Sequence, residues 1–461
     1  MTRSIFLISI ARTVSLALGV ILLALLGRRL GTSGFGTLQL ALAVMAYPLV
    51  LVDLGLTTFG LRAIAKGNVA PDLVQGVVAA RLILAAAALI ALGAAVIFLP
   101  LNPLTRTLVV VLGLGLPASA LNARWVLQGE RRFGRVAVID AASTGAQLLA
   151  VLILVRGEDD APAAAVALTI AAWATTTISA RLAGRWSRLR PRIVPGLSTM
   201  IRRSFPLGAA AIAITVYYSF DTILLGLFRG TEEVAYYAAA YRLILPIIAL
   251  AGAVGTVGIP HLSFLVARDA RAAEKAVADL SRQMVLVALP MAVGGALAAE
   301  PIIRLVYGPE FAAAVAPFRI LVWSVVTVFA NAAFAFLLLA RHGDRRYLAA
   351  VAAGAVSNIA LNLVVIPRAG MIGAAVVTMA SELIVLSMLL WWTRDVSRAA
   401  IPAALKTAAI PTLAMAMIVW PVHETLVAIP AGVVAFGVAA TLTGTISPGD
   451  LLARLRSWRA T

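Results

Sequence analysis

The sequence predicts an all-α protein that crosses a membrane about fourteen times. Three observations support this prediction: the composition, the apolar runs and the charge distribution. Of 461 residues, 62% are hydrophobic and 13% are charged, whereas soluble domains carry about 25% charged residues. A bilayer core about 30 Å thick requires about 20 apolar residues for each helical crossing. Because only helices and closed barrels satisfy their backbone groups in lipid, runs of this length are predicted to be helices.

Apolar runs separated by clusters of charge place the predicted helices along the chain. The first six are 5–27, 35–57, 75–99, 105–127, 134–155 and 162–184. The next six are 205–228, 234–259, 283–305, 313–340, 347–366 and 370–393, and the last two are 401–421 and 424–444.

Basic residues alternate between the two sets of connections, as the positive-inside rule requires. One set and the two termini hold 26 of the 38 Lys and Arg residues, and the opposite set holds seven. An error in the helix count would destroy this alternation from that point onward, so fourteen helices with both termini in the cytoplasm are predicted. The net charge of +18 is then a property of topology, and nucleic acid is not an expected partner.

Several chemical classes are disfavoured by what the sequence lacks. There is no cysteine, and His261, His342 and His423 lie far apart near predicted helix ends, so no metal centre is expected. No nucleotide-binding loop, serine-nucleophile elbow or zinc-protease motif is present. The sequence therefore predicts a protein that is not an enzyme and holds no cofactor.

The chain is predicted to consist of two six-helix lobes and an appendix. The expected divisions are an N-terminal lobe at 1–190, a cytoplasmic linker at 191–203, a C-terminal lobe at 204–395, and helices thirteen and fourteen with a cytoplasmic tail at 396–461. Leu26-Gly27 followed by Gly31-Thr32 recurs as Leu225-Gly226 followed by Gly230-Thr231. Either the match is chance in a Gly- and Leu-rich chain, or the lobes form a parallel repeat about an axis along the membrane normal.

The informative charges within the predicted membrane helices are ten: Arg12, Asp53, Arg81, Arg124, Asp140, Asp221, Arg242, Glu300, Arg319 and Glu382. Each costs about 2.5–3.5 kcal/mol at the bilayer centre on insertion scales, so they must pair or face water. Asp53, Arg124 and Glu300 lie near helix ends, where capping or snorkelling is as reasonable as function. For the deeper residues function is favoured, and pairing between helices is the alternative: Arg12, Arg81, Asp140, Asp221, Arg242 and Arg319.

Polar residues at helical spacing surround several of these charges in both halves, which predicts a water-filled cleft between the lobes. Deep arginines suit a large anion such as a pyrophosphate, because guanidinium groups bind phosphate oxygens with two hydrogen bonds. Carboxylates in a hydrated cleft can bind protons or sodium. The candidates for the coupling ion are Asp53, Asp140, Asp221, Glu300 and Glu382.

Four segments resemble a known family. They are Leu30-Gly31-Thr32-Ser33-Gly34-Phe35-Gly36, Asp53-Leu54-Gly55-Leu56 with Arg62-Ala63-Ile64-Ala65, the run from Glu300 to Phe311, and Gly370-Met371-Ile372-Gly373-Ala374-Ala375. Over residues 5–395 the chain is similar to the bacterial oligosaccharide flippases of O-antigen and polysaccharide type. These belong to the multidrug/oligosaccharidyl-lipid/polysaccharide exporter superfamily.

The resemblance implies two six-helix lobes that alternate access. It implies transport of an undecaprenyl-pyrophosphate-linked oligosaccharide from the cytoplasmic to the periplasmic leaflet of the bacterial inner membrane, for lipopolysaccharide or exopolysaccharide synthesis. It also implies coupling to protons or sodium, and contacts with membrane lipids and with glycan polymerase machinery. By location and chemistry, the pyrophosphate contacts expected are Arg12, Arg28, Arg29, Arg81, Arg242 and Arg319. For Arg28 and Arg29, snorkelling to lipid headgroups is the alternative.

Three other functions stay open at this point. A multidrug antiporter of the same fold would select cationic drugs through carboxylates, and the excess of deep arginine disfavours it. A lipid II flippase is a variant of the leading hypothesis. A membrane glycan polymerase is less favoured, because such enzymes need a sizeable outer loop and no predicted outer loop is long.

Overall fold

The structure is a computed structural model that describes residues 2–66, 71–184 and 190–445, without the side chains of residues 2–16, 71, 253, 256, 257 and 260. Within these ranges the chain forms helices and their connections and contains no strand. The all-α, polytopic fold predicted from the sequence is therefore confirmed. Contacts divide the chain into two compact units, residues 1–235 and 236–461, which are described in turn.

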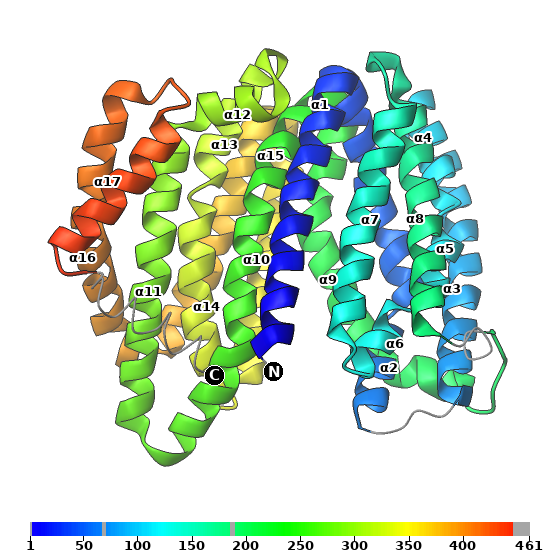
Figure 1. Cartoon of the computed structure of the whole chain (residues 1–461), viewed down its shortest axis with the longest axis horizontal. Helices are drawn as coiled ribbons and strands as arrows, with labels where there is room; N and C mark the ends of the chain where they lie inside the picture. The colour runs from blue at the N-terminus through cyan, green and yellow to red at the C-terminus, as the bar shows by residue number, and fades with distance from the viewer. Residues whose placement is uncertain (1, 67–70, 185–189, 446–461) are drawn as a thin grey trace. The chain divides into compact units, whose positions relative to one another are not determined.

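The first unit contains the helices coloured blue to green in Figure 1. They are α1 (Thr2–Asp53), α2 (Leu56–Ala65), α3 (Pro71–Phe98), α4 (Pro103–Gly113), α5 (Leu116–Leu121), α6 (Arg124–Gly129), α7 (Phe133–Leu154), η1 (Glu158–Asp160), α8 (Ala161–Ala183), α9 (Leu197–Phe228) and the first turn of α10 (Thr231–Arg268).

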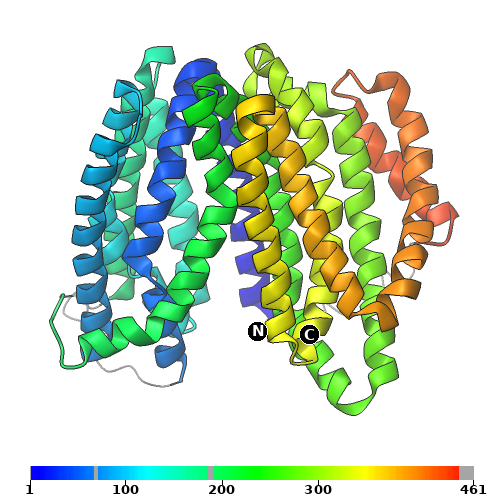
Figure 2. The same ribbon diagram turned by 180° about the vertical axis from the view of Figure 1, so that it is seen from behind.

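The second unit contains the rest of α10 and the helices coloured from green to red in Figures 1 and 2. They are α11 (Ala270–Leu297), α12 (Ala299–Tyr307), η3 (Pro309–Ala314), α13 (Val315–Leu321), α14 (Ser324–Ala340), α15 (Asp344–Trp392), α16 (Arg394–Val419), η4 (Trp420–Val422) and α17 (Ala428–Leu442).

Eleven helical segments among the described residues are long and apolar enough to cross a membrane, and α2 and α17 are shorter apolar helices. The chain is thus a multi-pass membrane protein, while the count of fourteen crossings and the orientation of the termini stay predictions. The predicted crossing 105–127 is built from three pieces, α4, α5 and α6. The breaks lie at Leu114-Gly115 and at Asn122-Ala123, and Asn122 has an extended backbone.

Two of the long helices are interrupted by a glycine. A straight helix of 52 residues would be about 78 Å long, far more than a bilayer core. In α1 the break is at Gly31, with φ 60°, and both ends of the helix lie at the lower side of Figure 1. In α15 the break is at Gly370, with φ 54°, and the helix turns back there in Figure 2. Positive φ costs glycine little because it has no Cβ.

The repeated glycine motif adopts related conformations in its two copies. Gly31 interrupts α1 with φ 60°, and Gly230 separates α9 from α10 with φ 94°. These are the corresponding positions of the motif, and both glycines end the first helix of a predicted half. A shared left-handed break supports a structural repeat, while the predicted lobe boundaries and the pseudo-two-fold stay predictions.

Small residues allow α9 to approach the junction of α1 and α2 closely. A Cβ added to Gly55 would lie 2.6 Å from the carbonyl oxygen of Ser204, and one added to Gly208 would lie 2.7 Å from the carbonyl carbon of Leu54. Such backbone-to-backbone packing is typical of helices in membranes. It places α9, which the sequence assigns to the second lobe, within the first compact unit.

In the second unit, α16 packs along α11, and α17 packs against the outer part of this pair. Val285 of α11 meets Ala404 and Ala408 of α16 in one apolar cluster. Met415 and Ala435 belong to another cluster, which joins α16 and α17 to the end of α11. The two C-terminal helices are thus docked on α11 through small and apolar side chains.

Candidate functional site: charged residues within the helices

Arg124 and Asp140 form an ion pair between α6 and α7. The guanidinium donates through Nε to Oδ1 at 2.6 Å and through a terminal nitrogen to Oδ2 at 2.7 Å. The two side chains are 41% and 38% exposed. Pairing between helices was the alternative interpretation of Asp140, and the structure shows such a pair.

Arg81 of α3 is buried and lies at the junction of three helices. Its Nε lies 3.6 Å from Oδ1 of Asp53 at the end of α1. Its terminal nitrogens donate to the carbonyl oxygens of Ser119 at 2.7 Å and Asn122 at 3.3 Å. Because α5 ends at Leu121, these are carbonyls at a helix C-terminus, where a cation is favoured. The guanidinium therefore joins α3 to the ends of both α1 and α5.

Asp53 also contributes to the start of α2. Its Oδ1 accepts hydrogen bonds from the backbone N–H of Thr57 at 3.3 Å and from the Thr57 hydroxyl. The first N–H groups of a helix have no partner within the helix, and a carboxylate there is stabilising. Capping was one of the two interpretations of Asp53 from sequence, and the structure shows this contact.

The neighbouring arginines Arg28 and Arg29 have different surroundings. Arg29 donates to the carbonyl oxygen of Leu152 at 3.0 Å, to that of Val151 at 3.5 Å and to that of Val155. These three carbonyls belong to the C-terminal end of α7, so Arg29 caps that helix. The side chain of Arg28 is exposed.

Glu382 lies in a buried polar cluster of the second unit. The residue is 9% exposed, and its Oε2 accepts a hydrogen bond from the side-chain amide of Asn331 in α14 at 3.0 Å. One turn earlier on α15, Thr378 is hydrogen bonded to the hydroxyl of Tyr237 at 3.2 Å. An amide and two hydroxyl groups from α10, α14 and α15 thus belong to the same polar cluster as this carboxylate.

The first half of α15 brings two further amides toward this region. Asn362 donates to Oδ1 of Asn358 at 3.0 Å, and both residues are buried. A Cβ on Gly354 would lie 3.5 Å from the carbonyl oxygen of Ser381, so the two halves of α15 pack closely there. Asn358 lies one helical turn after Gly354, and Thr378 lies nearly one turn before Ser381. Oδ1 of Asn331 and Oδ1 of Asn362 accept no hydrogen bond from any residue the structure describes.

Asp221 of α9 is 2% exposed. Its Oδ1 accepts from the backbone N–H of Thr222 at 2.6 Å and lies 3.3 Å from the Thr222 hydroxyl. Tyr47 of α1 is near enough to interact with it electrostatically. Asp221 and Glu382 are the most buried of the five carboxylates proposed from sequence.

The remaining predicted residues have the following surroundings. Glu300 forms a surface pair with Arg304 of the same helix at 2.9 Å. Arg319 of α13 is exposed. Arg242 of α10 lies within electrostatic range of Tyr241 and Tyr307. The side chain of Arg12 is outside the described residues.

Sequence reasoning overlooked some of the partners. Asn331 is the amide residue within the apolar run of α14, and that position could have identified it. The carbonyl groups that hold Arg29 and Arg81 could not have been found, because every residue has one. Among the described residues, no group of three His, Asp or Glu side chains is placed to hold a metal ion.

Apolar helices of membrane-spanning length that enclose buried charged and amide groups define a polytopic membrane protein of transporter type. A family model described as "Polysaccharide biosynthesis protein" matches residues 1–266, more than half of the chain. The chain belongs to this polysaccharide biosynthesis protein family, a flippase family of the multidrug/oligosaccharidyl-lipid/polysaccharide exporter superfamily, as its sequence motifs predict. No curated protein matches it.

Solved transporters share the fold at low sequence identity. A structure of the lipid II flippase MurJ in an inward closed conformation superimposes with a TM-score of 0.80 at 15% identity, covering 95% of this chain and 98% of that one. An inward-facing multidrug resistance transporter of the MATE family gives 0.68 at 15%, with 88% and 99% covered. A superfamily transporter from Pyrococcus furiosus gives 0.59 at 14%, with 87% and 96% covered.

Proposed function

We propose that this protein is a flippase that moves an undecaprenyl-pyrophosphate-linked oligosaccharide from the cytoplasmic to the periplasmic leaflet of the bacterial inner membrane. The observation that supports this most directly is membership of the polysaccharide biosynthesis protein family in a chain with ionisable groups inside its membrane helices. Such groups are costly in lipid and usually belong to a transport pathway.

The anionic headgroup is proposed to contact the arginines named from sequence. Arg28 and Arg319 are exposed, which suits an incoming pyrophosphate, and Arg12 and Arg242 complete the proposed set on membrane helices. Arg29 and Arg81 stay in the proposal, but their contacts with backbone carbonyls give each a structural task as well. Substitution should therefore affect stability at these two positions and transport at the others.

Cation coupling is proposed to depend on the buried carboxylates. A buried carboxylate can change its charge state by binding a proton or a cation. Glu382, which accepts from a neutral amide, is the leading candidate, and Asp221 is the second. The coupling ion is a proton or sodium.

Deletion of the gene tests the proposed substrate. Surface-glycan export should stop, and lipid-linked repeat units should accumulate facing the cytoplasm. Expression of the wild-type chain should restore export. Normal surface glycan in the deletion strain would contradict the proposal.

A lipid II flippase is the second candidate, because MurJ shares the fold over 95% of this chain. Depletion then has a different result: peptidoglycan synthesis stops and lipid II accumulates, whatever happens to other surface glycans. Measuring both lipid-linked pools in one depletion experiment distinguishes the two substrates.

A further inference from the structure

A tight turn joins α14 to α15. The helix α14 ends at Ala340, and α15 begins at Asp344. His342 has φ 58°, a left-handed conformation that is uncommon for residues other than glycine. Its N–H donates to the carbonyl of Leu339 at 3.0 Å, and the N–H of Gly343 donates to that of Leu338 at 2.8 Å. This is the hydrogen-bonding pattern that ends many helices, and it turns the chain within three residues.

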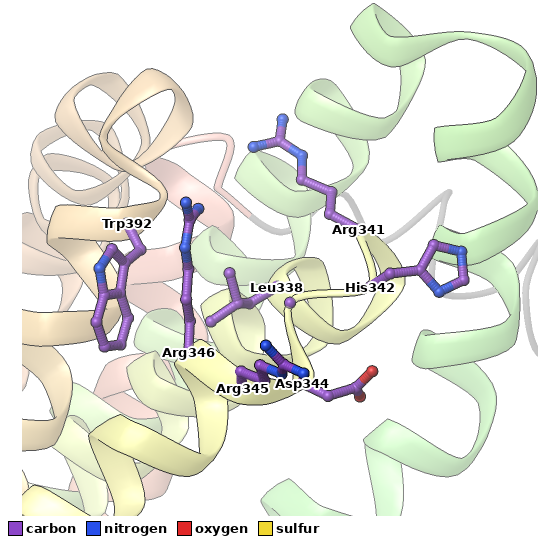
Figure 3. Close-up of a pocket in the computed structure, with 8 residues that line it drawn as sticks. Leu338, Arg341, His342, Asp344, Arg345, Arg346 and Trp392 are labelled. Atoms are coloured by element: carbon purple, nitrogen blue, oxygen red, sulfur yellow. The ribbon is translucent and has the colours of Figure 1, made fainter.

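This turn borders a cavity of about 640 Å³ that is rich in basic side chains. Figure 3 shows Arg341 and Arg346 extending in the same direction, with Leu338 between them. Arg345 and Asp344 lie on the near side of the same turn. Four charged side chains thus come from six consecutive residues and border one hollow.

Arg341 anchors the turn. One terminal nitrogen lies 2.6 Å from Oδ2 of Asp395 on α16, and the other lies 3.8 Å from Oε1 of Glu274 on α11. Two carboxylates from two helices therefore hold its guanidinium and compensate its charge. These contacts order the turn.

Arg345 and Arg346 are exposed, and neither forms an ion pair with any residue in the described part of the chain. They occupy the first turn of α15, where unpaired N–H groups and the helix dipole also favour an anion. Asp344 is the acidic group of the lining and offsets part of this charge.

The cavity also has an apolar side. Trp392, at the end of α15, borders it beside Arg346, and Leu338 is 3% exposed. Tryptophan at the end of a membrane helix is typical of the lipid–water interface. A hollow with two unpaired guanidinium groups and an indole ring suits a ligand with a phosphate group and an apolar portion.

We propose that this cavity binds a phosphate group at the membrane surface. The source is the headgroup of an anionic phospholipid or a soluble phosphate compound. None of its lining residues is among those proposed for substrate or ion contact, and the proposal does not depend on the substrate assigned above.

The test uses the full-length protein in mild detergent and native mass spectrometry. Phosphatidylglycerol, phosphatidylcholine and inorganic pyrophosphate are titrated separately. The double substitution Arg345→Gln/Arg346→Gln should weaken phosphatidylglycerol binding about 30-fold, as expected for the loss of two surface arginines. Arg202→Gln/Arg203→Gln is the matched control, because it removes another adjacent pair of exposed arginines that does not border this cavity.

A second variant is expected to bind more tightly, and a gain in binding cannot result from a failure to fold. Asp344→Asn removes the offsetting charge and should tighten binding about fivefold. Preference for phosphatidylglycerol over phosphatidylcholine, lost only in the Arg345/Arg346 variant, supports a lipid headgroup. Pyrophosphate binding with the same dependence, without a lipid preference, supports a soluble phosphate. Equal binding by both double variants, or no gain with Asp344→Asn, would overturn the proposal.

Discussion

The first and second units place charged groups inside the membrane region in different surroundings. In the first unit, Arg81 contacts Asp53, and Arg124 forms two hydrogen bonds with Asp140. In the second unit, Glu382 accepts from the neutral amide of Asn331. The contacts shown are between arginine and carboxylate in the first case and between an amide and a carboxylate in the second.

We propose that this difference reflects structural roles for the paired residues and a transport role for Glu382. An ion pair fixes two helices relative to each other, and breaking it leaves an uncompensated charge. A carboxylate among amides and hydroxyls has the ligands that a proton or a cation needs, and its charge state can change during a transport cycle. We therefore expect substitutions in the Arg81–Asp53 and Arg124–Asp140 pairs of the first unit to lower stability and those around Glu382 to lower transport.

The largest loss of stability is expected at Arg81. Arg81→Gln leaves Asp53 and two helix-end carbonyls without their partner. The free energy of unfolding should fall by about 3 kcal/mol, near the lower end for a broken buried pair because Asp53 is partly exposed. Unfolding by SDS titration measures it. Arg81→Lys is the control and should retain part of the stability. A loss below about 1 kcal/mol for Arg81→Gln would contradict the structural role.

The adjacent residues Arg29 and Arg28 test whether a structural role and a transport role can be told apart by their surroundings. Arg29→Gln removes the cap of α7 and should cost about 1.5 kcal/mol, the lower range for hydrogen bonds to a charged group. Arg28→Gln should lower the melting temperature less than Arg29→Gln and should slow transport. Thermal unfolding in detergent and a transport assay on both variants measure this. Equal effects of the two substitutions would show that their different surroundings have no consequence.

Arg124 and Asp140 provide a double-mutant cycle. The single substitutions Arg124→Gln and Asp140→Asn and the double variant should give a coupling free energy of about 1 kcal/mol, because both side chains are partly exposed. Chemical denaturation of the four proteins gives the value. Additive effects would mean that the pair contributes nothing to stability.

The smallest expected difference concerns the repeated glycines. Gly31→Ala and Gly230→Ala each force a Cβ into a positive-φ conformation, at a cost of about 1 kcal/mol. At Gly31 the new Cβ would also lie 3.3 Å from Cδ of Glu158, whereas around Gly230 the space is open. Gly31→Ala should therefore be the more destabilising by about 0.5 kcal/mol. The reverse order of melting temperatures would contradict the described packing.

Much of the fold could be predicted because lipid imposes simple rules. Apolar run length indicates where helices cross, and the glycine motif indicates where α1 turns back. Internal breaks were harder to predict. The crossing at 105–127 reads as one apolar run, but Gly115, Pro117 and Asn122 divide it into three pieces. Residues of this kind change the backbone path without changing hydropathy.

The charged residues themselves could be found from sequence, but their partners could not. Arg29 contacts carbonyls more than 120 residues away, and no side-chain pattern marks a carbonyl as an acceptor. Glu382 and Asn331 are 51 residues apart, and their contact depends on how α14 packs against α15. Long-range contacts of this kind follow from tertiary packing, so the sequence located the charges but left their structural or transport roles open.

Translocation by the purified protein is the most direct test of the central claim that Glu382 couples a cation to flipping. Wild-type protein and Glu382→Gln are reconstituted into proteoliposomes with a fluorescent undecaprenyl-pyrophosphate oligosaccharide, and a proton or sodium gradient is imposed. Asp140→Asn is the control for loss of a carboxylate. The wild type and the control should respond to one of the gradients, and Glu382→Gln should respond to neither while remaining folded. Gradient-driven flipping by Glu382→Gln at the wild-type rate would contradict the account.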